Sequence, residues 1–351
     1  MPEGDEAVRE TPPEDSGARR RAWVSREELH ALGRIPTAQV IVSIIVAWSA
    51  LFACLELSLR WHSLAADAAC FCVIGVLFNA IGSYWTHEAT HFNLAHDRKW
   101  NDLLGDLFLA GPTGVTVGHY RWQHFRHHSH VNDPDMEIDQ SAWICLRGPK
   151  LYSQIALHLI GWHALNTILR YRESSRDPRK ATLPPRSTAS IVSFVVVNTA
   201  VLLRCAVAGQ WYMYFLMWVG PLFTIAVAIG NIGTIVEHQP SSDVCDAGLV
   251  HLPVLTRLMH AGRLERLLLG HVGFYYHYEH HLYPRVPALR LPELRRLLEA
   301  RGCFDQPEIV HAEGYLRTLW RLSRDPRFGI RVPRVESGED RRSVDGALLV
   351  S

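Results

Sequence analysis

The sequence predicts an all-α integral membrane protein with four transmembrane helices in two hairpins and a cytosolic helical cap. Two observations predict this fold class. The apolar residues, 48% of the 351-residue chain, gather in four long runs, and 18 of the 20 histidines lie in the polar segments that follow the second and fourth runs. Eleven tryptophans fit the aromatic belts of a membrane protein.

The four apolar runs define the predicted spans, because each approaches the roughly 20 residues that a helix needs to cross a bilayer. The links within each pair of runs are very short, which favours two hairpins. The alternative is four buried helices of a soluble protein. Two weaker stretches, 103–117 and 152–169, are short or amphipathic, and we expect them to be interfacial or re-entrant. The predicted spans cover residues 38–59, 64–86, 188–209 and 211–236.

The polar segments then share one side of the membrane, and nearly all lysines and arginines lie in them. By the positive-inside rule that side is the cytoplasm. We expect one membrane domain over residues 23–331, between a disordered arm (1–22) and a disordered tail (332–351), because both ends are polar and charged. A net charge of +1 gives no reason to expect nucleic acid as a partner.

The seven cysteines are scattered along the chain and form no CxxC pair. Disulfide frameworks and cysteine-based zinc sites both depend on regular cysteine spacing. The sequence therefore predicts neither of them, and it offers no cysteine set for an iron–sulfur cluster.

Three histidine boxes carry the chemistry. His87 and His91 stand four residues apart at the end of the second run, so both face one side of a helix. The pattern HxxHH begins at His124 and is repeated 153 residues later, beginning at His277. Positions i, i+3 and i+4 fan over about 100° of a helix, so one segment can serve two metals held side by side.

Several metals and several functions fit these boxes. Imidazole ligands suit iron, zinc or copper. HExxH is also the motif of zinc metalloproteases, in which Glu88 would act as the general base. A metal carrier is a further alternative, although carriers favour exposed, flexible histidine tracts.

The residues around the boxes resemble the membrane fatty acid desaturase family, within the histidine-box di-iron desaturase/hydroxylase superfamily. The similar segments are HEATHFNLAHDRKWNDLLGDLF, HFRHHSHVNDPDMEID and HYEHHLYPRVPALRLPELRRLL, and the resemblance covers roughly residues 35–325. It implies one more ligand, an isolated histidine preceded by glutamate, which matches Glu237-His238. The ligands that it implies are His87, His91, His124, His127, His128, His238, His277, His280 and His281.

Polar residues beside these histidines are candidates for hydrogen bonds that orient the imidazoles. They are Glu88, Asp133, Asp135, Asn231, Glu237 and Glu279. Histidines outside the boxes are expected at the surface or beside the site, not as ligands: His96, His119, His130 and His271. We interpret the basic residues Arg121, Arg126, Lys150, Arg170 and Arg172 as part of the positive-inside surplus, or as contacts for a phosphate or carrier group.

The resemblance implies two iron ions, O2 and an external electron donor. The chain has neither the HPGG motif of a fused cytochrome b5 nor a dinucleotide fingerprint, so a separate ferredoxin or cytochrome with its reductase is implied. The predicted function is a membrane desaturase that introduces a double bond into a fatty acyl or lipid-like chain. The alternative is a hydroxylase or other oxidative tailoring enzyme on a lipid or secondary metabolite, and the remote alternative is an HExxH zinc metalloprotease.

Overall fold

The structure is a computed structural model of the chain. It describes residues 23–330 except 62, 133–144, 171–175, 178–179, 181, 243–244, 246–255 and 307–308. The predicted arm (1–22) and tail (332–351), together with Asp133 and Asp135, therefore lie outside the described residues.

Four helices of the described chain are long and apolar enough to cross a membrane, which confirms the number of predicted spans. They expose apolar side chains outward, as helices in lipid do: Val42, Val196 and Phe215 are more than half exposed. The second and fourth spans continue beyond their predicted carboxyl ends, to Thr90 and His238, and so carry histidines of the predicted site. The four spans are Arg26–Trp61, Leu64–Thr90, Thr188–Val207 and Tyr212–His238.

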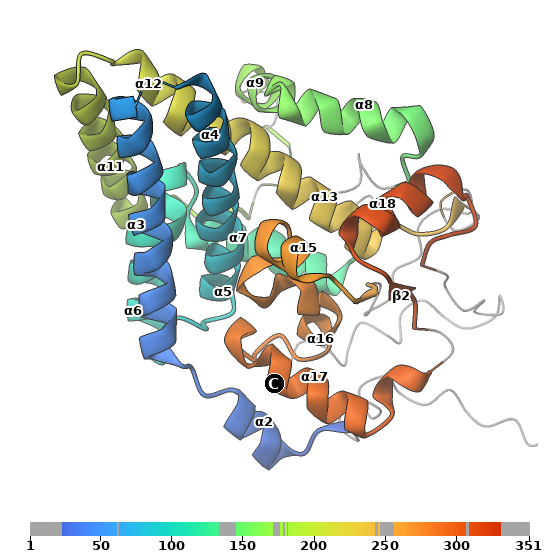
Figure 1. The fold of residues 1–351 in the computed structure, drawn as a ribbon. Helices are drawn as coiled ribbons and strands as arrows, with labels where there is room; N and C mark the ends of the chain where they lie inside the picture. The colour runs from blue at the N-terminus through green and yellow to red at the C-terminus, as the bar shows by residue number, and fades with distance from the viewer. Residues whose placement is uncertain are drawn as a thin grey trace, which may run out of the picture.

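The spans are built from several helical segments (Figure 1). Their elements are α2 (Arg26–Leu32) and α3 (Thr37–Trp61); α4 (Leu64–Asn79), the π-helix η1 (Ala80–Trp85) and α5 (Thr86–Thr90); α11 (Thr188–Val207); and α12 (Tyr212–Tyr214), the π-helices η5 (Phe215–Val219) and η6 (Leu222–Ala226), and α13 (Val227–His238). Between the second and third spans lie α6 (Arg98–Gly105), η2 (Asp106–Ala110), η3 (Gly111–Thr113), α7 (Val117–Ser129), α8 (Gly148–Leu159) and α9 (Trp162–Leu169). After the fourth span come β1 (Leu258–Met259), α15 (Arg263–Leu268), η7 (His271–Tyr276), α16 (His277–Leu282), η8 (Ala288–Arg290), α17 (Leu291–Ala300), η9 (Cys303–Asp305), β2 (His311–Ala312) and α18 (Tyr315–Arg324).

The second and fourth spans pack closely against each other. Gly75 on α4 faces Ile225 on η6, where an added Cβ would overlap the isoleucine side chain. One helical turn further, the buried Asn79 donates a 3.0 Å hydrogen bond to the carbonyl of Ala226. The ring of Phe78 meets that of Trp218 edge-on, with centroids 4.9 Å apart. This packing brings the carboxyl ends of the two spans to a common position.

The stretch predicted at 152–169 forms the helices α8 and α9, which bend at Gly161. Glycine is required at the bend because its φ of +74° lies in the left-handed region. The outer face is apolar: Ile160, Ile168 and Leu169 are each more than 60% exposed. Such a face fits the predicted interfacial position.

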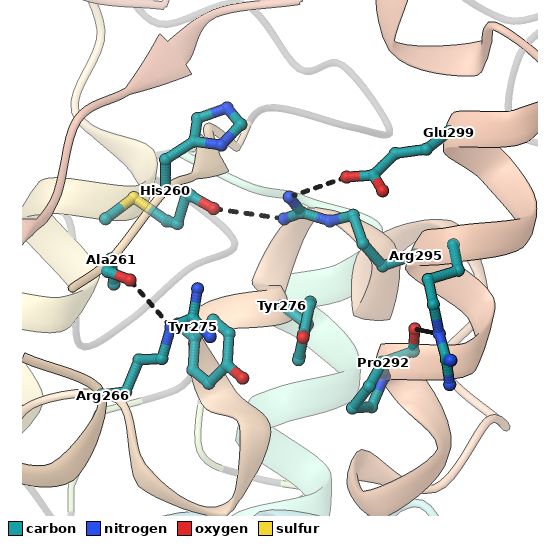
Figure 2. Close-up of a pocket in the computed structure, with 10 residues that line it drawn as sticks. His260, Ala261, Arg266, Tyr275, Tyr276, Pro292, Arg295 and Glu299 are labelled. Carbon is teal, nitrogen blue, oxygen red and sulfur yellow. Dashed lines mark hydrogen bonds and ion pairs between the residues drawn. The ribbon is translucent and has the colours of Figure 1, made fainter. Parts of the chain in front are cut away.

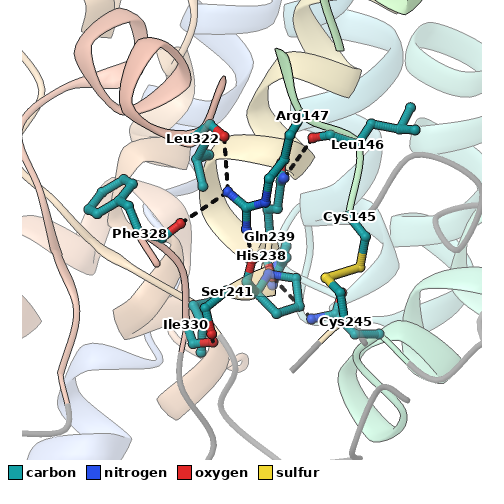
Figure 3. Close-up of a disulfide and its surroundings, with 12 residues drawn as sticks. Cys145, Leu146, Arg147, His238, Gln239, Ser241, Cys245, Leu322, Phe328 and Ile330 are labelled. Atoms are coloured by element: carbon teal, nitrogen blue, oxygen red, sulfur yellow. Dashed lines mark hydrogen bonds between the residues drawn. A yellow bond between two sulfur atoms is a disulfide. The ribbon is translucent and has the colours of Figure 1, made fainter. Parts of the chain in front are cut away.

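The structure contains a disulfide, which corrects the expectation from the cysteine spacing. Cys145 and Cys245 are bonded across 100 residues, with Cα atoms 5.9 Å apart. Figure 3 shows the bond beside Arg147, whose guanidinium donates to the carbonyls of Leu322 and Phe328. Only the fold brings these cysteines together, so their spacing gives no signal.

Candidate metal centre

The first histidine pair lies at the carboxyl end of the second span. The π-helix η1 directly precedes it, and the Thr86 hydroxyl donates to the carbonyl of Ile81 at 3.1 Å. His87 is buried on α5, and His91 forms the C-cap of the same helix. A π-turn shifts the helix register by a residue, so η1 sets which side of the span these imidazoles face.

The two HxxHH boxes form the helices α7 and α16, and each helix contributes to two groups of imidazoles. Within each group, one nitrogen of every histidine lies within 4.8 Å of the others. One group contains the first and last histidines of the first HxxHH box and the middle histidine of the second box. The other group contains the middle histidine of the first box and the first and last histidines of the second. The groups are His87, His91, His124, His128 and His280, and His127, His238, His277 and His281.

The nitrogens within each group point at one another. In the first group, Nε2 of His128 lies 2.8 Å from Nε2 of His124 and 3.0 Å from Nε2 of His280. In the second group, Nε2 of His277 lies 2.7 Å from Nε2 of His238 and 2.9 Å from Nε2 of His281. Also in the second group, Nε2 of His127 lies 3.3 Å from Nε2 of His281. The two groups adjoin, because the ring of His128 in the first group lies 4.4 Å from that of His281 in the second.

The chemistry of these donors fits two metal ions. Burial, reinforced by the neighbouring histidines, lowers the pKa of His124, His128 and His280 well below the ordinary value, which keeps them neutral. Neutral imidazoles offer the lone pairs that a metal requires. The buried Nε2 atoms of His87 and His91 have no hydrogen-bond partner among the described residues, as suits nitrogens reserved for a metal.

Three of the predicted carboxylates contact this centre or its supports. The buried Glu88 lies 3.2 Å from Nδ1 of His87, and its other oxygen accepts the backbone N–H of Ala288 at 2.7 Å. Glu237 accepts the hydroxyl of Tyr315 at 3.0 Å. The contact with His87 suits a group that orients an imidazole, and Glu88 is engaged on both oxygens.

The third carboxylate, Glu279, is fully buried and pairs with the guanidinium of Arg295. Asn231 does not join the centre, because its amide donates to the carbonyl of Val227 in its own helix. Outside the boxes, His119 and His271 contact the backbone carbonyls of Pro184 and Leu267. Neither belongs to the two groups of imidazoles.

Two arginines hold the helix ends that carry the histidines. Arg121 donates to the carbonyls of Ala89 and Thr90 at 3.0 and 2.9 Å, and it pairs with Asp102. These contacts within the protein correct its interpretation as surplus surface charge or a phosphate contact. Its sequence position gave no sign of them.

Arg257, which the sequence analysis missed, is fully buried and has the same role at the fourth span. It donates to the carbonyl of Val236 at 2.7 Å and to that of Gln239 at 2.5 Å. The amide of Asn132 donates to the carbonyl of His238 itself, at 3.0 Å. No pattern around Arg257 distinguishes it from a surface arginine.

Known proteins similar to this chain are oxidoreductases. The sequence matches the family described as "Fatty acid desaturase" over residues 61–308. Dihydrorhizobitoxine desaturase of Bradyrhizobium elkanii is 27% identical over 60% of this chain, and the match spans 62% of that relative's length. A beta-carotene ketolase of Paracoccus sp. (strain N81106 / MBIC 01143) is 27% identical over 76% of this chain and 96% of its own length. A sphingolipid delta(4)-desaturase of Drosophila melanogaster is 24% identical, over 90% of this chain and 96% of its own.

The family match covers well over half of the chain, including all three histidine boxes. It agrees with four helices able to span a membrane and with two buried groups of imidazoles. The protein therefore belongs to the fatty acid desaturase family and is a membrane oxidoreductase.

Proposed function

We propose that this protein is a membrane-bound, oxygen-dependent di-iron desaturase that introduces a double bond into a fatty acyl or lipid-like chain. The observation that carries the proposal is the division of nine imidazoles into adjoining groups of five and four. Two such groups fit two metal ions side by side, and the family implies iron. Two irons held there would supply the activation of O2 and the removal of hydrogen from an unactivated C–H bond.

The protein's own residues hold and shield this centre. Glu88 lies 3.2 Å from Nδ1 of His87 and so orients this imidazole with Nε2 toward the first group. Glu237 lies 3.6 Å from Nε2 of His277, beside the nitrogens of the second group. The ring of Phe274 lies 5.2 Å from that of His87 and 4.9 Å from that of His277. An apolar ring between the two groups excludes water, which protects a reactive centre from side reactions.

The reaction requires electrons that the chain does not supply. Removing two hydrogens from the substrate provides two electrons, whereas reducing O2 to two waters takes four. The other two electrons, with two protons, must come from a donor outside the chain. We propose a ferredoxin or cytochrome with its reductase.

Oxygen insertion is the second candidate, because the relatives differ in reaction type. The Paracoccus relative is named as a beta-carotene ketolase and the Bradyrhizobium relative as a desaturase. Hydroxylation also takes two external electrons, with one water formed and one oxygen atom kept in the product. The metalloprotease alternative has no support: the family is one of oxidoreductases, and Glu88 is engaged on both oxygens.

Analysis of products in cells tests the function. Cells that express the wild-type chain are compared with cells that express His280→Ala, by mass spectrometry of total lipids and secondary metabolites. We expect a product two mass units lighter than its precursor, found only with the wild type. A product heavier by one oxygen atom would favour the hydroxylase, and identical profiles would contradict both oxidative functions.

A further inference from the structure

A second candidate site lies on the surface behind the third histidine box. It is a pocket of about 360 Å³ between η7 and α17, large enough to admit a ligand or a partner's side chains. Figure 2 shows Arg266, Arg295, Tyr275 and Tyr276 in its walls, with Glu299 at one side. The guanidinium carbons lie over the tyrosine rings: Arg266 is 4.5 Å from the centroid of Tyr275, and Arg295 is 5.2 Å from that of Tyr276.

The pocket and its surroundings are strongly cationic. Three arginines and one glutamate line it. Residues 257–301 contain eight arginines and four glutamates, whereas the whole chain carries a net charge of only +1. Because the exposed Arg266 and Arg296 both belong to the lining, this surface attracts anions.

The pocket is connected directly to the candidate metal centre. Arg295 in its wall pairs with the buried Glu279, which lies between His277 and His280 in the third box. Tyr276, also in the wall, immediately precedes His277. Surface and centre are therefore separated by a single layer of residues.

The position of the pocket favours a soluble partner over a lipid. Figure 1 shows α17 beyond the lower ends of α4 and α5. It is tied to α2, at the amino end of the first span, by the ion pair of Arg301 with Glu28 at 2.7 Å. A ligand in this pocket would approach from the aqueous side.

We propose that this pocket docks an acidic one-electron carrier protein, which delivers electrons to the centre behind the third box. The inference rests on the proposed function, because that reaction takes two external electrons per turnover. The carrier docks twice and is oxidised by one electron each time. Its acidic side chains pair with Arg266 and Arg296, and this charge complementarity raises the rate of association.

Charge reversal at the pocket tests the proposal with the metal-loaded protein in lipid nanodiscs. The probes are an acidic [2Fe–2S] ferredoxin and the soluble haem domain of cytochrome b5. For the double variant Arg266→Glu/Arg296→Glu we expect the Kd of the bound carrier to rise about tenfold or more, together with its KM. Arg263→Glu, which changes a neighbouring charge on α15 outside the pocket lining, is the matched control and should change the Kd little.

A single turnover separates this proposal from the proposed function: the protein is reduced without air by a stoichiometric amount of dithionite, with no carrier present, and O2 is then added. The double variant should match the wild type there, since no carrier is used. If the wild type forms no product with either reductant, the proposed function fails. If dithionite supports turnover but neither carrier binds, or the double variant binds them as tightly as the wild type, the docking site is wrong. Arginine-dependent binding of inorganic phosphate or phosphatidylglycerol vesicles in place of the carriers would also overturn it.

Discussion

A metal ligand on the last turn of a helix is held only as firmly as that turn. Such turns end in carbonyls without intrahelical donors, so they fray unless another group binds them. Arg257 provides donors for the turn that carries His238, and Arg121 does so for the turn between His87 and His91. Each charged hydrogen bond contributes about 1.5–3 kcal/mol. The arginines therefore fix the position of ligands that they do not touch.

His238 is the proposed ligand that no box identifies, and its removal is the sharpest test of the ligand set. We predict that His238→Ala leaves expression and membrane insertion intact but lowers metal affinity about 100-fold or more, because it removes one of the four imidazoles in its group. Inductively coupled plasma mass spectrometry of the purified protein measures the effect. The control His96→Ala, at an exposed histidine outside both groups, should keep the full metal content. Normal metal content in the His238 variant would require another donor.

Residue spacing predicted the boxes because each box lies within one helix, where i, i+3 and i+4 fix the geometry. The grouping of His127 with His238, by contrast, depends on how two distant helices pack. The same holds for Arg257, whose partners lie about 20 residues away. Tertiary contacts of this kind leave no periodic pattern in the sequence.

At the scale of elements, the contact between the second and fourth spans sets the distance between the two groups of imidazoles. We predict that Gly75→Ala destabilises the protein by about 1–3 kcal/mol, because the new methyl group overlaps Ile225. Thermal unfolding in detergent, followed by circular dichroism, would show a lower midpoint. The control Gly233→Ala, also within a span, places its methyl group 4.0 Å from the nearest atom and should be nearly neutral. Equal midpoints for the two variants would contradict this account of the packing.

The α8–α9 pair should respond to acid. Burial, with the charge of His163, lowers the pKa of His158 from 6.5 to about 4. The unfolded segment binds a proton below pH 6.5 that the folded one does not bind until about pH 4, so the folded form loses stability as the pH falls through this window. We predict faster hydrogen–deuterium exchange of residues 148–169 at pH 5 than at pH 7, after correction for intrinsic rates. His158→Leu should abolish most of this difference, and a difference that persists would contradict it.

Hydropathy located the spans to within about four residues, apart from the amino end of the first, which begins at Arg26 and not at residue 38. The second and fourth spans run past their predicted carboxyl ends, to Thr90 and His238. Those ends were missed because a helix continues for as long as its hydrogen bonds and packing allow, whereas hydropathy stops at the first charge. The final turns from His87 and Glu237 onward are polar but buried by other parts of the protein. Sequence alone cannot distinguish such a turn from one that is exposed to water.

At the scale of the whole molecule, the orientation in the membrane and the single domain over 23–331 stay predictions. We predict that cysteine at position 63, in the link between the first two spans, is labelled from outside the cell, and that cysteine at position 96 is labelled only after permeabilisation. An impermeant maleimide, used in a background without the exposed Cys72, measures this. The positive-inside rule is the physical reason. Labelling of position 96 in intact cells would reverse the orientation.

The Cys145–Cys245 bond gives the molecule a built-in indicator of its surroundings. Glutathione and thioredoxin keep accessible thiols reduced in the cytosol, whereas the bacterial periplasm and the lumen of the endoplasmic reticulum favour the bond. Both cysteines lie in the polar segments that flank the histidine helices α7 and α13. Differential alkylation of the two sulfurs in living cells would thus report which compartment the histidine side faces, without any engineered label.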